Sequence, residues 1–154
     1  MRRGVAVTSM AVSLMLLLLA MPAAAATKTP VTFVDCIVSE GQPDRLWVSE
    51  DNILHIRGQV LETVIVSGDL TGSFVIDLNV NLDLSTGHGN IFGPLVLTTP
   101  AETWEGRFTG MITATGLSGR FVAQGSEGTK IMASFVQTSP VCFANEGTIL
   151  DPHG

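Results

Sequence analysis

A strict alternation of polar and apolar residues is the feature of this sequence that most limits its fold. From Gly72 to Leu84 an apolar side chain occupies every second position, and the stretch DLNVNLDL (77–84) puts aspartate or asparagine between them. Successive side chains of a β-strand point to opposite faces, so the pattern predicts a strand with one buried and one solvated face.

The same stretch could also be read as a calcium loop, because D-x-N-x-N resembles the start of an EF-hand. That loop needs glycine at its sixth position and glutamate at its twelfth, where this chain has Leu82 and His88. In an extended strand, at about 3.3 Å per residue, Asp77 and Asp83 lie about 20 Å apart, too far to share one ion. The stretch therefore predicts a strand and no metal site.

The rest of the chain repeats short runs of this kind between glycine-rich or polar turns. Beyond residue 26 no segment shows sustained apolar spacing at three and four residues, so no helix is predicted. The regular spacing of turns predicts antiparallel hairpins in sequence order. We expect strands at 31–38, 46–48, 53–67, 72–84, 91–98, 103–114, 117–124 and 130–138.

An antiparallel meander has two unpaired edges unless its first and last strands meet, and closure into a barrel removes them. Cys36 lies in the first run and Cys142 just after the last, and the chain has no other cysteine. In an oxidising compartment such a pair forms one bridge; a redox or metal role lacks both a CxxC spacing and a nearby histidine. The prediction is an all-β fold, a closed antiparallel up-and-down β-barrel of about eight strands, with a Cys36–Cys142 disulfide.

The first 26 residues have the composition of a secretory signal peptide. Arg2 and Arg3 precede an apolar run, and Ala24 and Ala26 supply small residues for cleavage. The alternative is a membrane anchor, but the run is shorter than the roughly 20 residues that span a bilayer. We therefore expect residues 1–26 to be removed, and 27–154 to form one β-barrel domain exported to a bacterial periplasm or the extracellular space.

The charge balance narrows the range of partners. The chain has 14 acidic residues against 8 lysines and arginines, and loss of Arg2 and Arg3 would make it more acidic still. Without a basic run it cannot neutralise a phosphate backbone, which argues against nucleic acid as a partner. Anionic membrane surfaces are disfavoured for the same reason.

Glycine and aromatic residues share one face of two consecutive runs. Trp104, Gly106, Phe108 and Gly110 alternate in the first run, Gly119 and Phe121 continue the pattern in the next, and Gly125 follows. Such glycines allow a sheet to coil tightly around a narrow interior. The predicted interior, and the lining of any ligand site in it, consists of Phe74, Ile76, Leu78, Trp104, Phe108 and Phe121.

Two runs break the alternation, because residues 64–66 and 95–97 are apolar on both faces. In an antiparallel sheet this pattern indicates that the outer face is also covered. The cover could be a loop, a terminal segment or a neighbouring subunit, and a homo-oligomer is one prediction.

Motifs of the common enzyme classes are absent from the sequence. There is no G-x-S-x-G, no H-E-x-x-H and no phosphate-binding glycine loop. His55 is the only histidine within a predicted strand; it could act as an acid or base beside Glu62 or Glu105, although a surface-facing histidine is favoured. We predict no catalytic residue, no metal ligand and no cofactor.

The segments SGDLTGSF, STGHGNIFGPLVLT, ETWEGRFTGMITATGLSGRF and GSEGTKIMASF, within residues 66–135, resemble the allene oxide cyclase and dirigent barrels, including uncharacterised bacterial members. The resemblance implies an eight-stranded barrel with an apolar cavity, often assembled as a trimer. It also implies a protein that holds a reactive small molecule in one conformation. No catalytic residue of those enzymes matches a position in this sequence.

Three functions follow from this interpretation. In the first, the barrel interior binds one small apolar molecule. In the second, side chains fill the interior and the protein works through its outer surface or its assembly. The third and weakest is a cyclase reaction inside the cavity.

Overall fold

The alternating stretch forms a strand, β4 (Ser73–Asp83), which lies between β3 and β5 in a nine-stranded antiparallel sheet. The structure is a computed structural model that describes residues 25–154. The other strands are β1 (Thr27–Glu40), β2 (Arg45–Val48), β3 (Ile53–Gly68), β5 (Gly89–Thr98), β6 (Thr103–Thr113), β7 (Gly116–Gln124), β8 (Lys130–Gln137) and β9 (Cys142–Asp151). A single 3-10 turn, η1 (Ser126–Gly128), separates β7 from β8.

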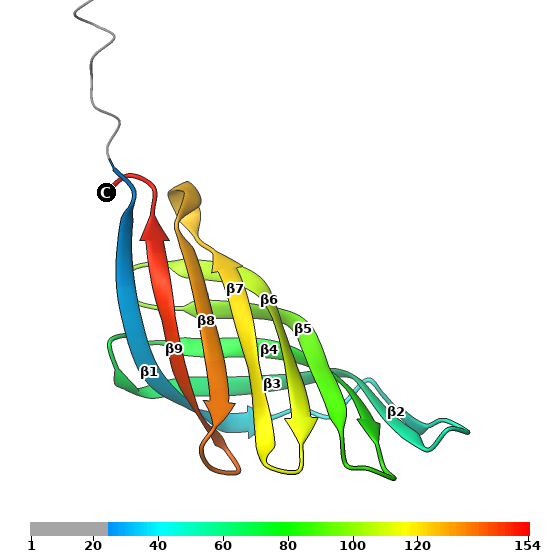
Figure 1. Ribbon diagram of the computed structural model, residues 1–154. Helices are drawn as coiled ribbons and strands as arrows, with labels where there is room; N and C mark the ends of the chain where they lie inside the picture. Colours follow the sequence, from blue (N-terminus) through cyan, green and yellow to red (C-terminus); the bar gives the residue numbers. More distant parts are fainter. Residues whose placement is uncertain (1–24) are drawn as a thin grey trace, which may run out of the picture.

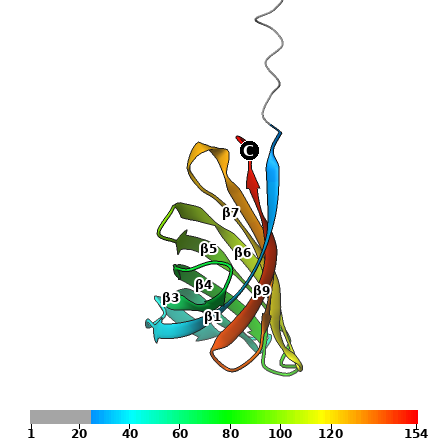
Figure 2. The same ribbon diagram turned by 90° about the vertical axis from the view of Figure 1, so that its left-hand side faces the viewer.

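The sheet closes on itself because β1 has partners on both sides. Its first ten residues, from Thr27 to Cys36, pair with β9, and its second half, from Phe33 to Glu40, pairs with β3. Figure 2 shows β1 and β9 side by side across the front of the barrel. The predicted closed antiparallel eight-stranded barrel is confirmed, with β2 as one additional strand.

The eight barrel strands are not the eight runs expected from the sequence. The run at 46–48 became β2, which pairs only with the start of β3 and projects beyond the barrel (Figure 1). Its place in the barrel is taken by β9, which pairs with both β1 and β8 and was not predicted. β1 and β2 pair one after the other with the same side of β3, separated by the turn at 41–44.

The predicted disulfide between Cys36 and Cys142 is confirmed. The two residues are direct cross-strand partners at the end of the β1–β9 ladder, with Cα atoms 4.1 Å apart. They are 106 residues apart in sequence. The bridge therefore links the first and last strands of the barrel at the point where closure occurs.

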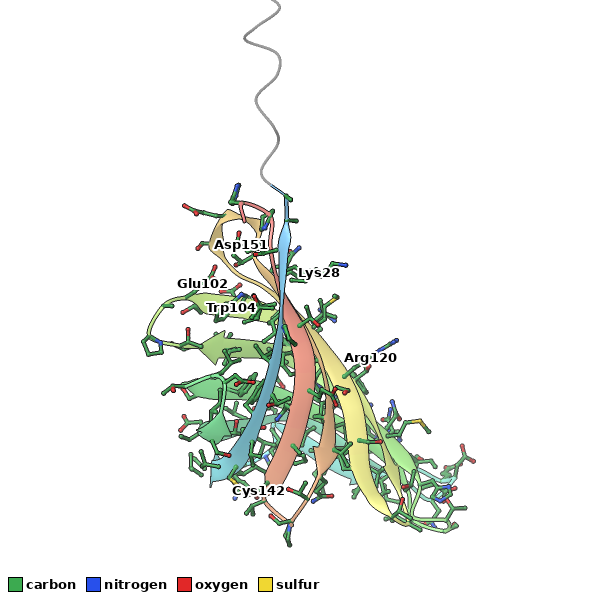
Figure 3. All side chains as sticks on the ribbon, turned by 60° about the vertical axis from the view of Figure 1, so that its left-hand side comes forward. Lys28, Glu102, Trp104, Arg120, Cys142 and Asp151 are labelled. Carbon is green, nitrogen blue, oxygen red and sulfur yellow. A yellow bond between two sulfur atoms is a disulfide. The ribbon has the colours of Figure 1, made fainter. Side chains whose placement is uncertain are left out.

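One end of the barrel is filled by side chains. Leu97 and Ile131 are fully buried there, and Ala123 and Trp104 are 1% and 5% exposed. Figure 3 shows Trp104 toward the end that holds Asp151, and Cys142 at the opposite end. The packed end lies beside the β5–β6 turn, η1 and the C-terminus.

The predicted signal peptide lies outside the described residues except for Ala25 and Ala26. Within residues 25–154 the structure contains no helix that is long and apolar enough to cross a membrane.

Candidate functional site

The half of the barrel nearer the disulfide contains a cavity of about 280 Å³. Its wall is mostly aliphatic and aromatic and includes side chains of β1, β3, β4, β5, β6, β7, β8 and β9. Glu40 and Gln137, at strand ends, and Pro140, in the β8–β9 turn, also border it, and Gln59 does so from within β3. The cavity therefore lies on the barrel axis, with its polar rim at the end opposite Trp104.

Five of the six residues predicted to line a ligand site border this cavity. Phe74, Ile76 and Leu78 contribute from β4, Phe108 from β6 and Phe121 from β7. The rings of Phe74 and Phe121 meet edge to face, with centroids 5.5 Å apart. The sixth residue, Trp104, is buried in the packed end and does not border the cavity.

Three buried polar residues interrupt the apolar wall. Asp35 of β1, Thr63 of β3 and Asn145 of β9 all line the cavity and are 5%, 1% and 6% exposed. The Asn145 amide donates a hydrogen bond of 2.7 Å to Oδ1 of Asp35 and one of 3.2 Å to the Phe143 carbonyl oxygen. These three side chains, the polar trio, lie on neighbouring strands where β1 closes the barrel.

The polar trio is incompletely paired. Thr63 Oγ1 is buried and has no hydrogen-bond partner of good geometry among residues 25–154. Burial raises the pKa of the Asp35 carboxyl above its ordinary value, and the nearby Thr63 hydroxyl and Asn145 amide, which act in the opposite direction, only partly offset this. The wall thus contains a buried carboxyl group, and no cationic side chain of residues 25–154 borders the cavity beside it.

Both ionisable side chains on the cavity wall are acidic. Asp35 lies inside and Glu40 lies exposed at the rim, whereas none of the lysines, arginines or histidines within residues 25–154 borders the cavity. An anionic ligand would therefore meet like charges and find no cation.

The polar trio was missed in the sequence. Asp35 and Asn145 are 110 residues apart, so no local spacing relates them, and each interrupts an otherwise apolar face. One signal was a polar residue at an inward position: Phe33, Asp35 and Ile37 alternate in β1. Asp35 precedes Cys36, and its position beside the predicted bridge is a further signal.

A glycine shapes the cavity wall next to Asn145. A Cβ at Gly119 of β7 would lie 2.5 Å from Cζ of Phe135, the β8 residue paired with it. Phe135 lines the cavity, and its ring meets that of Phe143 edge to face at 6.2 Å. The glycine thus lets a phenylalanine ring lie flat against the neighbouring strand. The expected alternation of glycine with aromatic residues therefore has a packing role here; Gly125, by contrast, lies just after β7.

His55 lies away from the cavity, on the projecting part of β3. Its ring stacks on Trp47 with centroids 4.7 Å apart, and Nδ1 is 2.8 Å from Oδ1 of Asn81. Asn81 also accepts a 2.6 Å hydrogen bond from Arg57. The polar side of DLNVNLDL therefore joins this outer network, and His55 contacts neither Glu62 nor Glu105 there.

No protein-family model matches this sequence, and no curated protein matches it either. Within residues 25–154 there is no group of three or more histidine, cysteine, aspartate or glutamate side chains arranged to hold a metal ion.

Proposed function

We propose that this chain is an exported β-barrel that binds one small, mainly apolar molecule inside the barrel. The observation that carries the proposal is the cavity of about 280 Å³, bounded by side chains from all eight barrel strands. An engineered apolar cavity of about 150 Å³ admits benzene, so this one has room for roughly one or two rings with a polar substituent. Burial of apolar ligand surface would provide most of the affinity, and the polar trio would orient the ligand.

Export is supported by the Cys36–Cys142 disulfide, since such bridges form and persist in oxidising compartments. The relationship to the allene oxide cyclase and dirigent barrels stays a prediction, supported by the eight-stranded closure and the apolar cavity.

The test is native mass spectrometry of the protein purified from its own host without reduction. We expect an added mass on the folded species that is released on denaturation. The variant Ile76→Phe should reduce this added species, because its side chain borders the cavity. Val75→Phe, the matched control, changes an outward side chain of the same strand that is 47% exposed, and should leave binding intact. The proposal would be contradicted if both variants carried the same fraction of the added mass, or if the original protein showed only the mass of the polypeptide.

A second candidate function is assembly through the outer face of β3 and β4. Val60, Val64, Val66 and Val75 are between 40% and 59% exposed there, and β4 pairs with both β3 and β5. Clustered exposed apolar side chains on one face mark interaction sites, so a homo-oligomer is proposed. Light scattering should then show more than one subunit, and Val66→Lys should shift the mass toward the monomer. A single-subunit mass throughout the micromolar range would exclude this assembly.

A further inference from the structure

The charge on the cavity wall restricts the kind of molecule that fits inside. Asp35 and Glu40 are the ionisable residues that border the cavity, and none of the basic side chains of residues 25–154 does so. A carboxylate or phosphate ligand would approach two acidic groups without finding a cation, which disfavours it electrostatically.

The polar trio has acceptor capacity beyond the hydrogen bond that Asn145 donates to Asp35. Asn145 uses its amide on Oδ1 of Asp35 at 2.7 Å and on the backbone. The Thr63 hydroxyl lies near Asp35, but its Oγ1 makes no hydrogen bond of good geometry among the described residues. Asp35 and Thr63 are 5% and 1% exposed, so solvent gives them little compensation. A ligand group with several N–H donors would satisfy both side chains at once.

An ammonium group has three such donors and no acceptor, whereas a hydroxyl group has one donor. It would also supply the counter-charge that a buried carboxylate requires, through a charge-assisted hydrogen bond in a site of low dielectric constant. We propose that the cavity selects a small apolar molecule with a protonated amine, whose nitrogen binds Asp35 and Thr63 while its hydrocarbon part packs on Phe74, Phe108 and Phe121. This inference rests on the proposed small-molecule function and specifies its ligand class.

The raised pKa of Asp35 agrees with this assignment. Burial disfavours the charged carboxylate on the cavity wall, and no described cation offsets that effect. An ammonium ligand would restore the charged form by pairing with it.

The experiment uses three aromatic probes of the same shape on the disulfide-bonded protein: naphthylmethylamine, naphthylmethanol and naphthoate. Isothermal titration calorimetry gives a dissociation constant for each at neutral pH. We expect the amine to bind about tenfold more tightly than the alcohol, since a hydrogen bond to a charged partner is roughly twice as strong as a neutral one. Naphthoate should bind more weakly than either.

Two variants test which acidic residue causes the preference for the amine over the alcohol. Asp35→Asn keeps the side-chain shape and removes the charge, so the amine should lose its advantage while the alcohol binds nearly as before. Glu40→Gln removes the acidic group at the exposed rim and should leave most of the preference for the amine. The ranking of the three probes on the original protein tests the proposal independently of whether either variant folds.

The outcomes separate the two proposals. If the alcohol or naphthoate binds as tightly as the amine, or if Asp35→Asn keeps the full preference, the ligand class is wrong and the small-molecule function stands. If none of the three probes binds and the native mass is bare, both proposals are overturned. The expected ranking, lost in Asp35→Asn and kept in Glu40→Gln, would support both.

Discussion

Removal of the Cys36–Cys142 disulfide should destabilise the barrel by an amount that follows from its topology. The bridge closes a loop with a sequence separation of 106 residues. On the chain-entropy model a loop of this length restricts the unfolded chain enough to stabilise the folded protein by about 4.7 kcal/mol at 25 °C. Because typical domains are stable by only about 5 to 15 kcal/mol, a large share of the folding free energy is at stake.

The perturbation is the double variant Cys36→Ala with Cys142→Ala, compared with the original protein in its oxidised and reduced forms. Urea unfolding gives the free energy of unfolding and the m-value of each. We expect a loss of about 3 to 5 kcal/mol in the double variant, since measured effects often fall below the entropic estimate. The m-value should rise, because an unfolded chain without the bridge exposes more surface to the denaturant.

The reduced original protein is the control, since it loses the bridge and keeps both side-chain positions. Similar losses in the reduced protein and the double variant would assign the effect to the cross-link itself. A loss under about 1 kcal/mol, with an unchanged m-value, would refute the reasoning. Such a small loss would mean that residual β1–β9 contacts already restrict the unfolded chain, or that the ten-residue β1–β9 ladder closes the barrel without the disulfide.

Three further predictions concern the barrel interior. Phe108→Ala should cost less in urea unfolding than the roughly 3 to 5 kcal/mol of a phenylalanine in a solid core, because Phe108 borders the cavity. A loss in that full range would contradict a hollow half. The folded protein retains the proton of Asp35 at a higher pH than the unfolded chain does. The free energy of unfolding should therefore fall as pH rises from the ordinary pKa of 3.8 through the raised value, and Asp35→Asn should remove that fall. An unchanged pH profile would argue against the shift. Gly119→Ala should lower the free energy of unfolding by about 1 to 3 kcal/mol, because the added methyl group overlaps neighbouring strands. The exposed neighbour Ser118→Ala should lower it by less than about 0.5 kcal/mol, and thermal unfolding measures both.

Local sequence patterns predicted the strands well where the inward face was purely apolar. The alternation from Gly72 to Leu84 corresponds to β4, and the run at 103–114 corresponds to β6 within one residue. The pattern failed at β9, where Asn145 and Gly147 occupy inward positions between Phe143 and Ile149. A buried polar residue beside a glycine removes the apolar periodicity by which such strands are recognised.

The partner of a strand was harder to predict than the strand itself. The run at 53–67 was expected as one barrel strand, yet the start of β3 pairs with β2 outside the barrel, and only its second half pairs with β1. Gly58, at φ 67°, lies between these halves beside a break in the β3–β4 register. Periodicity is a local property, whereas pairing depends on which strand edge is free when the barrel closes.

The sequence alone determined that this chain forms antiparallel strands and that its first and last parts meet, because alternation and the single cysteine pair act through local geometry and one covalent bond. Only the tertiary structure decided that one half of the barrel is packed and the other hollow, and that Asp35, Thr63 and Asn145 share a wall. A cavity depends on how side chains from eight strands fill a common volume, and the polar trio depends on β9 lying beside β1. Neither follows from residues that are neighbours in sequence, since both arise from contacts made when the barrel closes.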